Sequence, residues 1–245
     1  GLAISGKVVC ASTFAMFASG RAFEIIRNSI GYTGANVKIC ATHAGITVGE
    51  DGASHQTFED MALMRTIPGM TVINPSDGVS AQKLIEQAVA MEGPCYIRLG
   101  RASVPVTYKE EDSLTIGKGH QIREGKDVSI IATGIMVNEA VIASDMLSSE
   151  NIDARVIDIH TIKPIDRDII IKAAKETGGI VTCEEHSVIG GLGSAVAEIV
   201  SEEFPVKIQR VGQLDTFGES GKPEELKKKY GMTADDIVRA VKKVL

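Results

Sequence analysis

The sequence has no tryptophan, few aromatic residues of any kind and no run of basic side chains longer than three. Aromatic residues make up 4 % of its 245 residues, and the formal net charge is −6. Nucleic-acid-binding surfaces need basic patches, and single-stranded sites usually add aromatic stacking platforms. We therefore expect no nucleic-acid partner.

Long hydrophobic runs are also missing. The longest uncharged, apolar-rich stretch runs from Val128 to Val137, about half of the ~20 residues that a membrane-spanning helix requires. No basic segment leads into an apolar one near the N-terminus, so no secretory signal peptide is predicted. These features predict no membrane association.

Cysteine is scarce, and its four residues, Cys10, Cys40, Cys95 and Cys183, form no C-x-x-C pair. Three of the four lie in apolar runs. We therefore interpret them as buried free thiols in the reducing cytoplasm, with disulfides or a zinc site as alternatives. A chain of this length buries enough surface to fold without such cross-links.

Short apolar runs alternate with helical patterns along the whole chain. Strands are predicted at residues 37–41, 70–74, 95–99, 128–132, 154–159, 180–184 and 206–211. Helices are predicted after a cap at 76–77, at 138–149, 166–177 and 192–204, and from 233 onward. This order predicts an α/β fold with two open, mainly parallel-sheet domains in tandem.

The boundary between the two domains is predicted from a change of character at residues 106–126. A charged stretch at 108–112 is followed by a segment rich in glycine and polar residues. We expect a first domain at 1–112, a linker at 113–126 that could include a short edge hairpin, and a second domain at 127–245.

The densest polar cluster lies between Thr42 and Gln56. It follows a predicted strand, which places it at the carboxyl end of a sheet, where open α/β folds bind their ligands. His43 and His55 supply proton-transfer groups near neutral pH, and Asp51 supplies a hydrogen-bond acceptor. Three glycines in the cluster allow tight turns or close approach to a ligand. The alternative is a polar surface loop with incidental histidines.

Three other groups leave the choice between structure and function open. Gly190–Gly193 begins a predicted helix and could bind an anion on its amides, although close helix–sheet packing also explains it. Glu184–His186 ends a strand and is interpreted as a hydrogen-bonding network at a domain or subunit contact. The zinc-ligand types around His43 and His55 match no zinc spacing, so no metal site is predicted.

Phe14 and Phe17 lie three residues apart before a predicted helix. Such residues usually belong to the core, but they could also form a wall against which a flat ring stacks. Arg101 follows a strand and could bind a phosphate with its planar guanidinium group, or lie in solvent.

These segments, in their order along the chain, resemble transketolase. The pyrimidine-binding domain of that family is matched by Ser12–Phe17, Thr42–His43, Gly49–Gln56, Asn74–Asp77 and Arg98–Arg101. Its C-terminal domain is matched by Thr161–Asp166 and Glu184–Gly193. The likeness covers essentially the whole chain and implies an N-terminally truncated pyrimidine-binding domain followed by a transketolase C-terminal domain. Related thiamine enzymes share both domains but typically carry different loops.

The resemblance implies a role for each matched site residue. Phe14 and Phe17 would form the pocket around the aminopyrimidine ring of thiamine diphosphate. His55 would face that ring and the reacting carbon, and would assist proton transfer. Asp51 would accept a hydrogen bond from a hydroxyl group of the donor sugar.

His43 and Arg101 would bind the phosphate of the sugar. The implied reaction moves a two-carbon ketol unit from a ketose phosphate to an aldose phosphate, as in the pentose phosphate pathway. A subunit of a related enzyme such as 1-deoxyxylulose-5-phosphate synthase and a non-catalytic assembly module are the alternatives.

The family's diphosphate-binding domain has no counterpart in this sequence. By the resemblance, the family's glutamate that contacts the pyrimidine would lie before Gly1, so we expect this chain to be part of a longer product. The implied partner is an N-terminal transketolase subunit that carries the diphosphate-binding domain with Mg²⁺ or Ca²⁺ and shares thiamine diphosphate with this chain. We expect a homodimer of this chain within a heterotetramer, and no activity from the chain alone.

Overall fold

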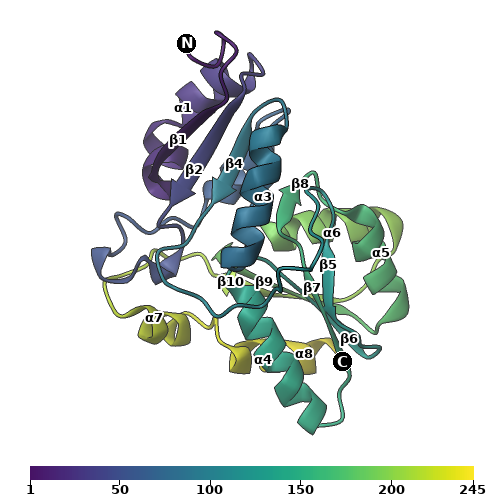
Figure 1. Cartoon of the computed structure of the whole chain (residues 1–245). Coiled ribbons are helices and arrows are strands. Elements are labelled where there is room, and N and C mark those ends of the chain that lie inside the picture. Colours follow the sequence, from purple (N-terminus) through teal and green to yellow (C-terminus); the bar gives the residue numbers. More distant parts are fainter.

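Two five-stranded sheets form the centre of the computed structural model, which describes residues 1–245 (Figure 1). The strand order is β1-β2-β4-β3-β8 in the first sheet and β10-β9-β6-β7-β5 in the second. Only β5 and β8 run antiparallel to their neighbours. The predicted α/β fold with two mainly parallel sheets is therefore confirmed.

The strands are β1 (Val9–Phe14), β2 (Val37–Thr42), β3 (Thr71–Ile73), β4 (Cys95–Arg98), β5 (His120–Arg123), β6 (Val128–Ala132), β7 (Ala154–Asp158), β8 (Thr161–Lys163), β9 (Ile180–Ser187) and β10 (Ile208–Gln213). The helices are η1 (Phe17–Arg21), α1 (Phe23–Ile25), η2 (Ile26–Gly31), η3 (Ile46–Asp51), α2 (Asp60–Thr66), α3 (Gly78–Ala90), α4 (Met136–Ser149), α5 (Arg167–Glu176), α6 (Leu192–Glu203), α7 (Pro223–Lys229) and α8 (Ala234–Val244). None of them has the length and apolar character to cross a membrane.

The central strands are buried and the edge strand β1 is not. β3, β4 and β6 are buried along their whole length, as their continuous apolar runs predict. In β1 four of the six residues are exposed. The prediction of buried thiols is therefore right for Cys95 and Cys183 but wrong for Cys10, which lies exposed on β1. Cys40 is half-buried, and all four cysteines are free.

The two halves of the chain are connected by more than a linker. Strand β8, which comes after β7 in the sequence, joins the first sheet and pairs antiparallel with β3. The Lys163 ammonium group at the end of β8 donates hydrogen bonds to the carbonyl oxygens of Arg65 and Ile67, which end α2. The expected linker contains one edge strand, β5, rather than a hairpin. The boundaries at residues 112 and 127 stay a prediction.

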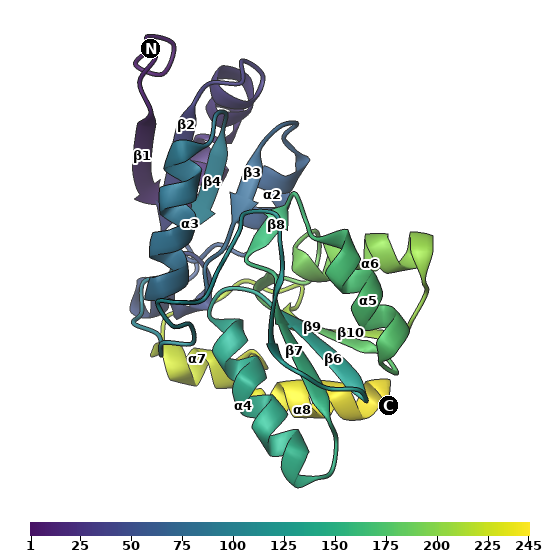
Figure 2. The same ribbon diagram turned by 45° about the vertical axis from the view of Figure 1, so that its right-hand side comes forward.

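The hydrophobic core is also shared between the halves. Helices α5 and α6 lie on one side of the second sheet, and α4 and α8 lie on the other (Figure 2). The cluster on the α5–α6 side continues into α2 and the first sheet. The cluster on the α4–α8 side includes Ile46 and Phe58, which come from the first half of the chain.

Candidate active site

Three segments meet at the carboxyl ends of β1, β2 and β4. These strands are neighbours in the parallel part of the first sheet, so their C-terminal ends lie along one edge. Residues 43–57, which we call the site loop, follow β2. All six residues singled out in the sequence lie on these segments: Phe14, Phe17, His43, Asp51, His55 and Arg101.

Four of the six residues form an aromatic cluster of two phenyl and two imidazole rings. The Phe14 ring stacks on His43, with centroids 4.0 Å apart, and lies nearly parallel to Phe17 at 5.9 Å. His55 meets Phe14 and Phe17 edge-on at 6.0 and 5.4 Å. Phe17 is 41 % exposed. The cluster therefore offers an open apolar surface with imidazole groups at its side.

The two imidazole rings each keep one nitrogen available. In His43, Nδ1 lies 3.0 Å from the hydroxyl group of Thr42, and in His55 Nδ1 lies 3.0 Å from the hydroxyl group of Ser54. The Nε2 atom of each ring has no protein partner. His43 has a positive φ of 57°, which is uncommon for a residue with a side chain.

Arg101, which follows β4, contacts the site loop. Its Nη1 atom donates a hydrogen bond of 2.5 Å to the carbonyl oxygen of Val48. The same atom lies 3.7 Å from a carboxylate oxygen of Glu50 and 3.7 Å from one of Asp51. The Arg101 side chain is 41 % exposed, so the guanidinium group retains donors for an anion from solvent.

The site loop is a packed segment rather than a polar surface loop. Ile46, Thr47, Val48 and Gly49 are buried. The side-chain Nε2 atom of Gln56 donates to the carbonyl oxygens of Ile46 and Gly49 within the loop. These contacts close the loop on itself and fix the positions of its polar residues.

A buried ionic network lies beside the site loop, and its partners could not be predicted from the sequence. The Arg98 guanidinium group donates to a carboxylate oxygen of Asp60 at 2.9 Å and to the main-chain carbonyl of Glu185 at 2.8 Å. The hydroxyl group of Tyr96 donates to the same Asp60 oxygen. Burial raises the pKa of the Glu185 carboxyl, while Arg98 acts in the opposite direction.

The neighbours of Glu185 on β9 are structural. The Glu184 carboxylate accepts hydrogen bonds from the amides of Leu192 and Gly193 at the start of α6. The suggested anion site on these glycine-rich amides is therefore filled by the protein's own side chain. Burial lowers the pKa of His186 to about 4, and its ring accepts a hydrogen bond from the amide of Ala62 in α2. These contacts match the predicted network at a domain contact.

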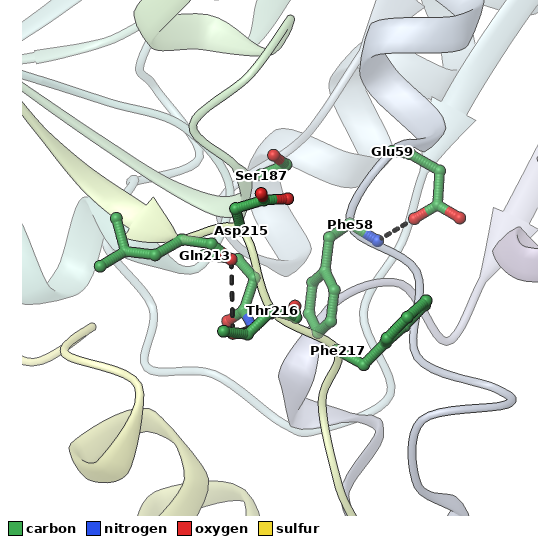
Figure 3. A pocket seen from close by; sticks show the side chains of 8 residues that line it. Phe58, Glu59, Ser187, Gln213, Asp215, Thr216 and Phe217 are labelled. Carbon is green, nitrogen blue, oxygen red and sulfur yellow. Dashed lines mark hydrogen bonds between the residues drawn. The ribbon is translucent and has the colours of Figure 1, made fainter.

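A separate cavity of about 240 Å³ lies between the two halves of the chain (Figure 3). It is lined by Phe58, Glu59, Ser187 and residues 213–217, and by none of the six predicted site residues. Two of its polar side chains are engaged within the chain, since Glu59 accepts from the amide of Phe58 and the amide nitrogen of the Gln213 side chain donates to Thr216. It therefore offers less chemistry than the aromatic cluster. No group of three or more His, Cys, Asp or Glu side chains is arranged to hold a metal ion.

Comparison with known proteins identifies both halves of the chain. Residues 1–107 match the family model "Transketolase, pyrimidine binding domain", and residues 117–237 match "Transketolase, C-terminal domain". A protein of Methanocaldococcus jannaschii named "Putative transketolase C-terminal section" is 50 % identical over 98 % of this chain and 76 % of its own length. A 6-deoxy-6-sulfo-D-fructose transketolase subunit of a Clostridium species is 45 % identical over 100 % of this chain and 76 % of its own length.

A solved structure gives the same result in three dimensions. It is titled "Split gene transketolase, inactive beta4 tetramer" and superposes with a TM-score of 0.95. It is 53 % identical to this chain and covers 100 % of it, while the match spans 78 % of that structure's own chain. The chain belongs to the transketolase family.

Proposed function

We propose that this chain is the C-terminal subunit of a transketolase that uses thiamine diphosphate to move a two-carbon ketol unit from a ketose phosphate to an aldose phosphate. The observation that carries the proposal is the meeting of the aromatic cluster with the Arg101–Asp51 pair at one sheet edge. The aromatic cluster suits a flat cofactor, and the neighbouring Arg101 suits the phosphate of a sugar.

The cofactor fits this chain's residues at the aromatic cluster. Phe14 and Phe17 present nearly parallel rings, and Phe17 is partly exposed, so a flat pyrimidine can pack against them. His55 lies edge-on to both rings, which places an imidazole nitrogen within reach of the bound ring for proton transfer. Thiamine diphosphate, when bound, supplies the carbon nucleophile and electron sink for the reaction.

The sugar would bind beside the aromatic cluster, at Arg101 and Asp51. Arg101 has free guanidinium donors for a phosphate, and His43, which stacks on Phe14, would add an imidazole nitrogen. Asp51 lies 3.7 Å from Arg101 and would accept a hydrogen bond from a hydroxyl group of the donor. This carboxylate would select sugars that present a hydroxyl group at that position.

The remaining half of the site would come from a partner. Nothing in this chain resembles a metal centre or a diphosphate cradle, so an N-terminal transketolase subunit would bring the diphosphate-binding domain with its Mg²⁺ or Ca²⁺. The related split-gene structure is described as an inactive tetramer of one subunit, which supports the need for a second polypeptide. We expect a homodimer of this chain within a heterotetramer. Four free cysteines agree with a reducing compartment such as the cytoplasm.

Reconstitution tests the proposal. This chain, an N-terminal transketolase subunit, thiamine diphosphate and Mg²⁺ are combined with xylulose 5-phosphate and ribose 5-phosphate, and glyceraldehyde 3-phosphate release is followed. We expect product only when both polypeptides are present. Pyruvate as the preferred donor would instead indicate an enzyme like 1-deoxyxylulose-5-phosphate synthase. A complex that binds no thiamine diphosphate would indicate a non-catalytic assembly module.

A second candidate substrate class comes from one relative. The Clostridium relative is named for a sulfonated sugar rather than a phosphorylated one. A sulfonate carries one negative charge, and the guanidinium group of Arg101 can bind it as it binds a phosphate. The ratio of kcat/KM for the phosphorylated donor and 6-deoxy-6-sulfo-D-fructose, measured in the same reconstituted complex, distinguishes the two classes and decides whether the pentose phosphate pathway is the setting.

A further inference from the structure

The site loop is held mainly by the second half of the chain. Ile46 in the loop and Phe58, the residue directly after it, pack into the hydrophobic cluster of the second sheet. The carbonyl oxygen of Phe58 accepts a hydrogen bond of 2.8 Å from the amide of Ser187 on β9. The loop that carries Asp51 and His55 is therefore seated on β9 and not only on its own sheet.

One charged side chain reaches from β9 into the site loop. The Glu185 carboxylate accepts a hydrogen bond of 2.7 Å from the amide of Thr47. It also fills the space beside Gly45, where a Cβ atom would lie 2.2–2.4 Å from the carboxylate. Gly45 has a positive φ of 84°, so both its backbone conformation and this contact require glycine. The loop turns around the Glu185 carboxylate.

A short path of contacts leads from Glu185 to the rim of the site. Thr47, whose amide it holds, precedes Val48, whose carbonyl oxygen accepts the hydrogen bond from Arg101. Glu185 itself is fixed by Arg98, which donates to its main-chain carbonyl and lies on β4 three residues before Arg101. The carboxylate thus sets the position of the loop segment against the strand that carries the anion-binding arginine.

We infer that Glu185 is a positioning residue that holds Thr47 and Val48 in place, so that Arg101 and Asp51 present one fixed site to the sugar. This inference rests on the proposed function for its catalytic consequence, but its structural part concerns this chain alone. Glu185 forms its hydrogen bonds and ion pair with Thr47 and Arg98 and none with the aromatic cluster, so we expect it to act on the sugar side of the site.

The chain offers a matched control at the adjacent position. Glu184 lies on the same strand, is equally buried, and points to the opposite face of the sheet. Its carboxylate holds the start of α6 and contacts no atom of the site loop. Glu185→Asp and Glu184→Asp delete the same buried methylene group and retain the charge, so they differ chiefly in whether the site loop loses its anchor.

The first measurement is amide hydrogen exchange in the whole chain without a partner. In Glu185→Asp we expect peptides covering residues 45–51 to exchange about 10–100-fold faster, as befits the loss of one charge-assisted hydrogen bond. In Glu184→Asp we expect wild-type exchange in these peptides. Glu185→Gln retains the length of the side chain and an acceptor oxygen, so it should restore most of the protection.

The second measurement is steady-state kinetics in the complex with the N-terminal subunit. For Glu185→Asp we expect the KM of the phosphorylated donor to rise about 10-fold while the Kd of thiamine diphosphate stays within about threefold of wild type. For Glu184→Asp we expect both constants to stay at wild-type values. This division between KM and cofactor affinity is not produced by a general loss of stability.

The outcomes separate this inference from the proposed function. Wild-type loop exchange in Glu185→Asp, or equal acceleration in both aspartate variants, would overturn the positioning role. Faster loop exchange with an unchanged donor KM would overturn its catalytic consequence. If the wild-type complex transfers no ketol unit but the loop opens only in Glu185→Asp, the proposed function fails while the structural assignment holds.

Discussion

The unfolding free energy of Asp158→Asn should increase relative to that of the wild type as the pH rises. Asp158 ends β7 and is completely buried between the two sheets. One of its carboxylate oxygens accepts hydrogen bonds from Tyr108 at 2.8 Å and from Ser76 at 3.0 Å, and the other has no partner. Burial raises the pKa of Asp158 from its ordinary value of 3.8 to about 7, although both hydrogen bonds act in the opposite direction.

The magnitude of the effect follows from that shift. Between about pH 4 and pH 7 the folded protein keeps a proton on Asp158 that the unfolded chain releases, so this group costs stability as the pH rises through that window. Each pKa unit corresponds to 1.36 kcal/mol. Between pH 4.5 and 7.5 the lost stability is about 3 kcal/mol, and asparagine, which has no proton to lose, removes that loss.

The wild-type curve alone would not reveal this contribution, because other buried groups oppose it. Burial raises the pKa of Glu184 to about 7, which acts in the same direction as Asp158. Burial lowers the pKa of His160 and of His186 to about 4. The folded protein holds these two rings neutral while the unfolded chain protonates them, so they make stability rise between about pH 4 and 6.5. The two carboxyls and two imidazoles therefore largely cancel.

The assay is urea unfolding of wild type and Asp158→Asn at pH 4.5, 6.0 and 7.5. The difference in unfolding free energy should move in favour of the variant by about 3 kcal/mol from the lowest to the highest pH. Asp168→Asn serves as the control, because the side chain at this position is 94 % exposed. Its unfolding free energy should depend on pH in the same way as that of the wild type. A constant difference between Asp158→Asn and wild type across the three pH values would refute the reasoning.

Three further predictions concern the site and its support. Arg101→Ala should raise the KM for phosphorylated donors about 10–150-fold in the reconstituted complex; an equal rise for unphosphorylated donors would contradict a phosphate contact. Phe14→Ala should weaken thiamine diphosphate binding about 10-fold, measured by cofactor titration, because it removes one wall of the aromatic cluster. Asp77→Ala removes the N-terminal cap of α3, where the carboxylate accepts from the amide of Ser80 at 2.8 Å. The loss of a cap worth about 1 kcal/mol should lower the Tm by about 2–4 °C; an unchanged Tm would show that solvent replaces the cap.

The buried strands and capped helices could be predicted because their signals are local. Strands β2, β4, β6 and β9 are runs of apolar and β-branched residues, which is what a sheet covered on both faces requires. Helices α3 and α5 begin after Asp77 and Asp166, whose side chains accept hydrogen bonds from first-turn amides. Helix α8 begins after Thr233, whose amide donates to the carboxylate of Asp236 in the first turn. Such signals lie within a few residues of the element they define.

Other elements could not be predicted, because long-range contacts define them. Strand β8 has three residues, and only the edge that β3 presents makes it a strand. Strand β1 is largely exposed and carries small and polar residues, so it lacks the apolar run that marks a buried strand. The same exposure explains the error at Cys10.

The meeting of the six site residues could be anticipated only in part. Phe14, His43 and Arg101 follow strands β1, β2 and β4 or end them, so they lie at the same edge once these strands are parallel neighbours. The order of strands in a sheet cannot be predicted from any single segment of the sequence. The Glu184–His186 triplet in an otherwise apolar strand did signal buried polar contacts, because burying such groups without partners is costly. It could not identify Thr47 as the partner of Glu185.

The glycines of the site loop show how the two halves of the chain depend on each other. In the sequence they suggested close approach of the backbone to a ligand, but each is approached by a residue from the second half. The Glu185 carboxylate lies against Gly45, Pro223 lies against Gly49, and the Ser220 hydroxyl group lies against Gly52. Glycine raises the conformational entropy lost on folding, so a loop with three of them needs external contacts to stay fixed. The second half of the chain, which contributes none of the six site residues, therefore supplies the order that the site requires.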